Sequence, residues 1–212
     1  MNPTTTDYFE RARHDVAALV PSDSQRILEI GAGFGALGRI LSQRGDILLD
    51  AVELNPAAAP HLDGLYRRFW IGDIQTLSLD DALSDYDCIV FPDVLEHLVD
   101  PWTQLAKLCE RLRPGGYVVA SVPNVRNLAL LYRLIVQGHW EYENSGLLDR
   151  THLRFFTRHS IVEMLEGAGL TVERWGMNRD GYTGVRKAVA SVAKMFIPEI
   201  DVCQYLVVAR KS

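Results

Sequence analysis

Short apolar runs of strand length alternate along the chain with longer segments in which apolar residues recur every three or four positions. This alternation is typical of a doubly wound α/β fold, in which helices cover both faces of a mostly parallel sheet. The pattern predicts strands near residues 26–30, 47–53, 68–71, 87–91, 116–121, 170–176 and 202–210. It predicts helices near residues 6–19, 35–44, 56–64, 101–112, 126–136, 159–168 and 184–195.

The length of the chain limits how this pattern can be organised. A chain of 212 residues can bury one sizeable core, but it is short for a cofactor domain followed by a separate substrate domain. We therefore expect a single domain over residues 1–212. Within it, residues 1–21 form a helical leader. Residues 124–158, which include long aperiodic stretches, form a cap inserted after the fifth strand.

A glycine-rich turn interrupts the pattern after the first predicted strand. The apolar run ending at Ile30 is followed by Gly-Ala-Gly-Phe-Gly, and helical periodicity starts directly afterwards. Without side chains at Gly31 and Gly33, the backbone can take positive φ and approach a ligand, which then faces free N–H groups of the helix start. A small polar ligand is expected there. The glycines alone also fit a dinucleotide-binding turn.

Two acidic residues accompany this turn. Glu29 lies inside the first predicted strand and Glu53 ends the second. A carboxylate can accept two hydrogen bonds from a diol, and charge-assisted bonds are stronger than neutral ones. Together with Gly31, Gly33 and Gly35, Glu29 resembles the E/D-x-G-x-G-x-G motif of class I S-adenosylmethionine-dependent methyltransferases. In that family the residue matching Glu53 holds both ribose hydroxyls, although nicotinamide enzymes use a carboxylate in the same way.

Three further stretches extend the resemblance. Residues 70–74 resemble the third-strand motif, in which the acidic residue, here Asp73, binds the adenine amino group and Ile74 completes the adenine slot. Residues 87–98 resemble the motif beside the methionine part of the cofactor, and residues 112–119 resemble the turn into the fifth strand. The resemblance implies S-adenosyl-L-methionine as the cofactor and a Rossmann-like sheet of seven strands with an antiparallel last strand. It assigns cofactor contacts to Glu29, Gly31, Ala32, Gly33, Gly35, Glu53, Leu54, Asp73, Ile74 and Asp93.

The predicted cap resembles a narrower group of enzymes. Its stretch Asp-Arg-Thr-His-Leu-Arg-Phe-Phe-Thr, residues 149–157, is similar to small methyltransferases associated with polysaccharides and natural products, and more distantly to ubiquinone-pathway O-methyltransferases. The resemblance implies methyl transfer to a hydroxyl of a sugar, a glycan or another small biosynthetic intermediate. Three alternatives stay open: an N-methyltransferase of a small molecule, a cofactor-binding regulatory module without catalysis, and a nicotinamide oxidoreductase.

A functional role for the leader, residues 1–21, is implied only by the family resemblance. In that family such a segment often folds over the open side of the cofactor. We therefore expect Tyr8, Phe9 and Arg13 near the cofactor or the acceptor, with core packing of the two aromatic residues as the alternative.

Methyl transfer to a hydroxyl requires a proton to leave the acceptor, and a histidine suits this task. We expect His152 in the cap to act as the base, with Asp149 as its orienting partner. A structural role for His152 is the alternative, and His97 is the second candidate. Glu96 and His97 follow Asp93 with the i, i+3, i+4 spacing of a helical metal site. Because methyl transfer needs no Lewis acid unless the acceptor is catechol-like, we expect no metal.

Charge divides the chain into two parts. Residues 1–123 carry a net charge of −8 and residues 124–212 one of +3. The basic part suits an anionic acceptor, although solvated helix faces would give the same composition. The cationic residues concerned are Arg126, Arg133, Arg150, Arg154, Arg158, Arg179, Arg186 and Lys187. A nucleic-acid partner is not expected, because the whole chain has a net charge of −5 and no basic stripe interleaved with aromatic residues.

The cysteines and the start of the chain bear on location. Cys88, Cys109 and Cys203 are widely spaced in apolar runs without a C-x-x-C pattern. Met1 is followed by polar residues, and no apolar run has the length of a membrane span. These features predict a cytoplasmic protein without a membrane span, and they leave its oligomeric state open.

Overall fold

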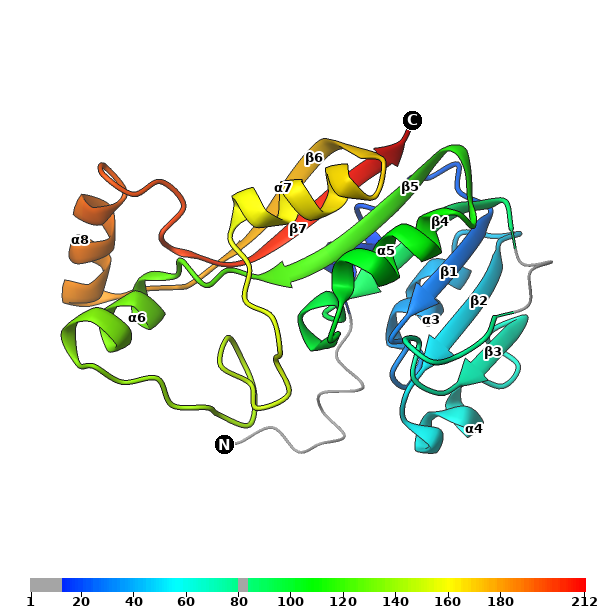
Figure 1. Cartoon of the computed structure of the whole chain (residues 1–212), viewed down its shortest axis with the longest axis horizontal. Coiled ribbons are helices and arrows are strands. Elements are labelled where there is room, and N and C mark those ends of the chain that lie inside the picture. The colour runs from blue at the N-terminus through cyan, green and yellow to red at the C-terminus, as the bar shows by residue number, and fades with distance from the viewer. Residues whose placement is uncertain (1–12, 80–83) are drawn as a thin grey trace.

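A twisted sheet forms the centre of the molecule (Figure 1). The computed structural model describes residues 13–79 and 84–212, and within them seven strands follow the order β3-β2-β1-β4-β5-β7-β6. Strand β7 runs antiparallel to β5 and β6, whereas the other neighbouring strands are parallel, which confirms the predicted fold class. The strands are β1 Arg26–Ile30, β2 Leu48–Glu53, β3 Arg68–Ile71, β4 Tyr86–Pro92, β5 Leu112–Pro123, β6 Leu170–Arg179 and β7 Val202–Lys211.

Helices cover both faces of this sheet. Helices α5 and α7 pack into one apolar cluster, and α2, α3 and α4 pack into another on the opposite face. The helical elements are α2 His14–Ala17, α3 Ala36–Ser42, η1 Pro56–Ala58, α4 Ala59–Leu62, η2 Leu95–His97, α5 Pro101–Cys109, α6 Leu128–Leu131, η3 Tyr132–Val136, α7 Arg158–Gly167 and α8 Gly184–Ala193. None of the helices in the described part of the chain has the length and apolar content needed to cross a bilayer.

Strand β1 illustrates how the apolar runs become the core. Leu28 and Ile30 belong to the cluster with α5 and α7, whereas Ile27 belongs to the cluster with α2 and α3. All three residues are at most 1% exposed. Because both faces of a parallel sheet are covered, its strands are apolar on both sides. The sequence therefore shows these strands as continuous apolar runs.

Strands β5 and β6 are longer than the sequence pattern predicts. β5 begins at Leu112, ahead of the turn signal Pro-Gly-Gly at residues 114–116, and β6 continues to Arg179. The glycines do not end the strand but produce an irregularity in its pairing with β4. The antiparallel ribbon of β5, β7 and β6 therefore extends beyond the parallel part of the sheet toward α6 and α8 (Figure 1).

The predicted leader helix over residues 6–19 lies partly outside the described residues, as do Tyr8 and Phe9. In the described part, α2 is confined to His14–Ala17. Its buried residues, Val16 and Ala17, belong to the apolar cluster that includes α3. The described end of the leader therefore packs on the α3 side of the sheet.

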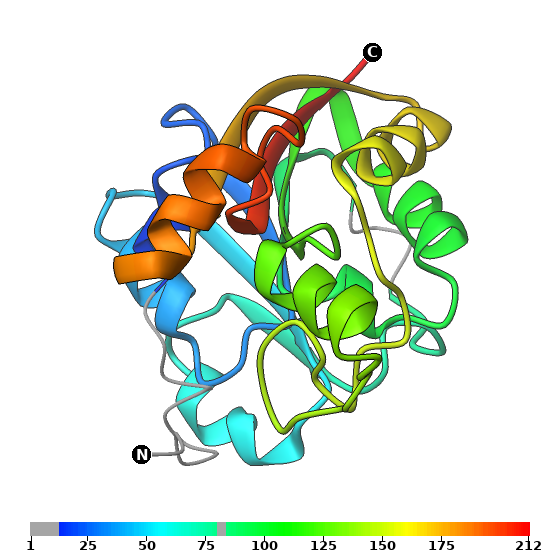
Figure 2. The ribbon, with the colours of Figure 1, turned by 90° about the vertical axis from the view of Figure 1, so that its left-hand side faces the viewer.

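The predicted cap leaves β5 and returns to α7 as a closed excursion (Figure 2). The helix predicted over residues 126–136 is present as α6 followed by the wider π-helical turns of η3. The Asn127 side chain caps α6 by accepting a 3.0 Å hydrogen bond from the Ala129 N–H, and Thr157 begins α7 with a capping box. Asn124 and Phe156 form an isolated bridge, so the two ends of the cap lie side by side.

Candidate active site

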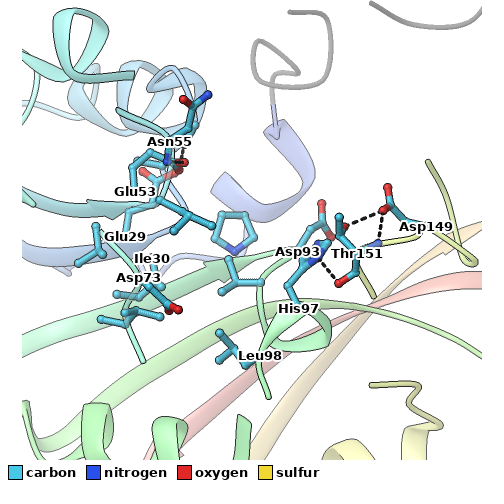
Figure 3. Close-up of a pocket in the computed structure, with 18 of the residues that line it drawn as sticks. Glu29, Ile30, Glu53, Asn55, Asp73, Asp93, His97, Leu98, Asp149 and Thr151 are labelled. Atoms are coloured by element: carbon cyan, nitrogen blue, oxygen red, sulfur yellow. Dashed lines mark hydrogen bonds between the residues drawn. The ribbon is translucent and has the colours of Figure 1, made fainter. Parts of the chain in front are cut away.

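A cavity of about 1170 Å³ opens at the carboxyl ends of β1, β2, β3 and β4 (Figure 3). Each of these strands contributes the loop that follows it, and the cap contributes residues 143–145 and 149–151. Ligands of doubly wound sheets bind at this edge. The structure therefore brings most of the predicted site residues to one cavity, namely Glu29, Gly31, Ala32, Gly33, Glu53, Leu54, Asp73, Ile74, Asp93, His97 and Asp149.

The turn after β1 needs glycine for both conformation and space. Gly31 has φ +80°, and a Cβ added there would lie 2.5 Å from Cγ2 of Val94. Gly33 also has positive φ, at +53°. Gly35 differs from the expectation, because it is not among the residues that line the cavity. Gly35 precedes α3 with φ +80°, and an added Cβ would lie 2.7 Å from the Leu65 side chain. Glycine is therefore needed at this position for the backbone conformation and for packing against Leu65.

Glu53 lies at the end of β2 with its carboxylate held by backbone. Oε2 accepts from the Gly33 N–H at 2.7 Å, and Oε1 accepts from the Asn55 N–H at 2.8 Å. A carboxylate oxygen can accept more than one hydrogen bond, so each oxygen retains acceptor capacity. The residue is 5% exposed and lines the cavity. This carboxylate is therefore positioned in advance to accept from two adjacent hydroxyls.

Glu29 lies deeper, beneath the glycine turn. It is 1% exposed, and its Oε2 accepts a 2.6 Å hydrogen bond from the Tyr66 hydroxyl. Burial raises the pKa of Glu29 to about 8, with a further contribution from the nearby Glu53, although the Tyr66 hydrogen bond opposes the shift. Glu29 thus favours its protonated form at neutral pH and shapes the floor of the cavity.

The loops after β2 and β3 form one end of the cavity. Asp73 accepts a 2.9 Å hydrogen bond from the Gln75 N–H, and Ile74 is 6% exposed. Leu54 also lines this end and is 67% exposed. A carboxylate that lines a cavity together with two apolar side chains can receive a flat ring with an amino group. Asn55 was not predicted; its place directly after Leu54 is the signal that could have indicated it.

Asp93 connects distant parts of the chain at the other end of the cavity. It has φ +58°, a conformation uncommon for residues other than glycine. Its carboxylate accepts from Ser121 of β5 at 2.8 Å, from Gln204 of β7 and from Arg13 of the leader. Arg13 also lines the cavity, and its expected contact with the cofactor or the acceptor stays a prediction.

His97 and His152 lie together beside Asp93, and the structure changes the expected relation between them. Their ring centroids are 4.8 Å apart. His97 lines the cavity, whereas His152 is 8% exposed and is not among the lining residues. The Asp149 carboxylate accepts from the backbone and hydroxyl of Thr151, at 2.8 and 2.6 Å, and not from His152. His152 Nδ1 faces the Leu147 carbonyl at 3.1 Å, so its orienting partner is a backbone oxygen.

The charges around the cavity are mostly acidic. Six acidic residues line it, and among the described residues the lysine and arginine side chains on its wall are Arg13 and Arg150. Most of the other arginines considered from the sequence have local partners: Arg133 pairs with Glu143 at 2.6 Å, and Arg179 pairs with Asp201 at 2.5 Å. Such a wall suits a cationic ligand, and Arg150 is the residue that could bind an anionic group of a ligand.

Comparison with known proteins gives the class of this site. A family model described as a methyltransferase domain matches residues 5–174. The ubiquinone biosynthesis O-methyltransferase of Cereibacter sphaeroides is 30% identical over 188 residues, which cover 84% of this chain and 75% of that protein. The enzyme of the same name from Dinoroseobacter shibae is 31% identical with the same coverage.

Solved structures share the fold. An S-adenosylmethionine-dependent methyltransferase from Mesorhizobium loti has a TM-score of 0.63 at 18% identity, covering 93% of this chain and 96% of that chain. The Burkholderia thailandensis 1,6-didemethyltoxoflavin-N1-methyltransferase, solved with S-adenosylhomocysteine, has a TM-score of 0.63 at 19% identity, covering 96% and 79%.

The seven-stranded sheet and its carboxyl-edge cavity thus define a Rossmann-like methyltransferase. The chain belongs to the methyltransferase-domain family, and its cofactor is S-adenosyl-L-methionine. The described residues fit this cofactor: the Gly31 turn leaves no room for a side chain, Glu53 offers free acceptor capacity, and the acidic wall suits a positive sulfonium. The nicotinamide alternative is set aside by these findings.

Proposed function

We propose that this methyltransferase acts on a hydroxyl group of a small biosynthetic intermediate. The observation that carries the proposal is the similarity to enzymes named ubiquinone biosynthesis O-methyltransferase over 84% of the chain. A quinone precursor is therefore the first acceptor class to test, followed by the sugar and glycan hydroxyls expected from the cap sequence. The N1-methyltransferase neighbour, at 19% identity, supports the fold and does not argue for an amine acceptor.

The cofactor side of the cavity is assigned to the loops after β1, β2 and β3. We assign the ribose diol to Glu53, because its two oxygens already face the cavity from fixed positions. Asp73 would accept from the adenine amino group between Leu54 and Ile74. Bound in this way, the cofactor supplies a methyl group already activated by its sulfonium sulfur. The chain then has to place an acceptor oxygen in line with that methyl group and exclude competing water.

The acceptor side is assigned to the wall built by β4 and the cap. Asp93 and His97 line it from the sheet, and residues 149–151 line it from the cap. Arg150 is 3.4 Å from Asn144 through a weak hydrogen bond, so its guanidinium can take an additional partner. An acceptor that carries a carboxylate or phosphate would place that group at Arg150.

Removal of the hydroxyl proton is assigned to Glu96, His97 and His152, which we call the histidine–glutamate cluster. Burial and the neighbouring His152 ring lower the pKa of His97, so this imidazole is neutral at pH 7. His97 lies on the cavity wall and His152 lies behind it. The base role predicted for His152 therefore depends on this cluster acting as a unit, with His97 next to the acceptor.

An acceptor screen with a radiolabelled methyl donor tests the proposal. We expect label in a hydroxylated quinone precursor or another hydroxylated intermediate. We expect His152→Ala to lower turnover at least roughly tenfold, a conservative figure because general acid–base catalysis typically contributes about 100-fold to 10,000-fold. The affinity for S-adenosylhomocysteine, measured by calorimetry, should stay unchanged in this variant. Label only in amines would overturn the O-methylation proposal, and unchanged turnover in His152→Ala would remove the cluster from the mechanism.

A further inference from the structure

Two helical segments at the end of the β5–β7–β6 ribbon leave large apolar side chains on the surface. Helix α8 and the α6–η3 segment lie side by side there in both views of the chain (Figures 1 and 2), and the Leu128 N–H donates a 2.7 Å hydrogen bond to the Ile200 carbonyl at their base. Eight apolar residues of η3, of α8 and of the turn after α8 are between 42% and 77% exposed, and we call this surface the ribbon-end patch. Its residues are Tyr132, Leu134, Ile135, Val136, Val189, Val192, Met195 and Phe196.

Helix α8 turns its apolar stripe away from the rest of the described chain. Among the α8 residues whose side chains the structure describes, only Ala190 is buried. Val189 and Val192 are 51% and 58% exposed, and Phe196 in the following turn is 77% exposed. These three residues have the spacing i, i+3, i+7 and therefore share one helix face, which in a surface helix normally packs against the core. Here that face points to solvent, so it has no partner within the described residues.

The η3 segment repeats this arrangement. None of its five residues is buried, and Ile135 and Val136 are 74% and 65% exposed. Its π-helical turns are a rare conformation that occurs often at functional sites. Residues 132–136 do not line the cavity, so the active site does not account for their exposure.

The area of the ribbon-end patch matches one side of a stable protein interface. At these exposed fractions its eight residues present on the order of 900 Å² to solvent, close to the roughly 800 Å² that each partner buries in a standard interface. The largest apolar patch of a typical monomer is smaller, about 300–600 Å². The patch is therefore large enough to hold a second protein without help from other surfaces.

The charges beside the patch suit a protein partner better than a bilayer. Arg133 pairs with Glu143 at 2.6 Å, and both Arg179 and Lys194 pair with Asp201 at 2.5 Å. An anionic lipid surface attracts cations that are not already neutralised by carboxylates. The whole chain also has a net charge of −5, which opposes its approach to such a surface.

The two halves of the patch are complementary in charge. Lys187 on α8 is exposed and has no ion pair with any residue that the structure describes. The Glu141 side chain, which follows η3, is 69% exposed and lies 3.8 Å from Arg133. A two-fold axis that places α8 of one copy on η3 of another would cover both apolar faces and would bring a cationic edge to an anionic edge twice.

We propose that the ribbon-end patch is a dimer interface in which α8 of one copy packs against the α6–η3 segment of a second copy. This interface is continuous with the cap wall of the cavity, because Arg133 of η3 holds Glu143, which lines the cavity. The dimer would therefore hold the cap in place. The benefit for the acceptor rests on the proposed function, whereas the dimer itself does not.

Sedimentation velocity over a range of protein concentrations tests the interface. The native chain should be a dimer at micromolar concentration, and Val192→Lys and Ile135→Lys should each raise the dimer dissociation constant at least roughly thirtyfold, the loss expected at one interface hot spot. Val99→Lys is the matched control, because Val99 is 59% exposed, as Val192 is 58% exposed, but lies outside the patch. This control should leave the dissociation constant unchanged.

Hydrogen exchange measures the effect on the cap. Amides of residues 132–145 should exchange more slowly in the native dimer than in folded Val192→Lys, whereas amides of α7 should exchange equally in both. Equal exchange of residues 132–145 in a confirmed dimer would refute the proposed packing of α8 on η3.

Three other outcomes would overturn the proposal. One is a native monomer at every concentration, and flotation of that monomer with phosphatidylglycerol vesicles would identify a bilayer as the occupant of the patch instead. The others are an unchanged dimer in both lysine variants of the patch, and an equal loss in Val99→Lys. Calorimetry with S-adenosylhomocysteine on the same samples should give one site per chain and equal affinity in the native chain and Val192→Lys, so a failure of the cofactor site is recognised separately.

Discussion

Replacing Glu53 by glutamine is the sharpest test of the cofactor site, because it preserves size and changes charge and hydrogen bonding. In the native protein one oxygen accepts from Gly33 at 2.7 Å and the other accepts from Asn55 at 2.8 Å. A glutamine has one oxygen and one NH₂ group. Whichever way it turns, its NH₂ group faces a backbone N–H, and one acceptor for the ribose diol is lost.

The size of the effect follows from these bonds. A hydrogen bond to a charged group contributes about 1.5–3 kcal/mol, and the variant loses one such bond and the charge on the other. We therefore expect a loss of about 3 kcal/mol, which corresponds to roughly a hundredfold weaker binding. The backbone donors of the turn would also lose one partner, so a modest loss of thermal stability should accompany it.

Calorimetry with S-adenosylhomocysteine measures this loss directly. Glu166→Gln on α7 is the matched control, because that residue is exposed and is not among the residues that line the cavity. Circular dichroism establishes that both variants are folded before binding is measured. If folded Glu53→Gln bound the ligand within threefold of the native protein, the assignment of the ribose diol to Glu53 would be refuted.

Two further predictions concern the floor of the cavity. Gly31→Ala places a Cβ 2.5 Å from the Val94 side chain at φ +80°, so it should lower the free energy of unfolding by about 1–3 kcal/mol and weaken ligand binding. Gly146→Ala is the control, because Gly146 has φ +87° but nothing within 4 Å of an added Cβ, so this variant should show only the conformational cost. Differential scanning calorimetry measures the stability of both variants. Because the pKa of Glu29 rises from its ordinary value near 4.5 to about 8, the folded protein holds this proton more tightly than the unfolded chain. The free energy of unfolding should therefore fall as the pH rises through that interval, and Glu29→Gln should flatten the slope in urea titrations; an unchanged slope would contradict the buried protonated carboxyl.

The sequence indicated well which residues line the part of the cavity that we assign to the cofactor, because these residues follow strands. Gly31, Glu53 and Asp73 each come directly after or at the end of an apolar run, and the carboxyl ends of parallel strands meet at one edge. Residue type and position in the chain were therefore sufficient to predict that these three residues lie together. The backbone partners of Glu53, which fix its orientation, depend on loop geometry that no periodicity expresses.

The acceptor half could not be predicted to the same depth. The cap has no period, so the sequence did not show that Asp149 would turn to Thr151 or that His152 would face Glu96. Those contacts depend on which backbone carbonyls come within reach after folding. Spacing alone suggested a metal group containing Asp93, whereas the tertiary structure gives that residue three other partners.

The antiparallel strand β7, inserted between β5 and β6, has a consequence for biosynthesis. Asp93 is held by Gln204, a residue of that late strand, while the turn at Gly31 and its partner Glu53 belong to the earliest strands. During translation the strands that carry the turn and Glu53 therefore emerge early, whereas the contact that holds Asp93 must wait for β7 to emerge and pair at long range. A nascent chain halted before β7 would lack the Gln204 side chain that donates to Asp93.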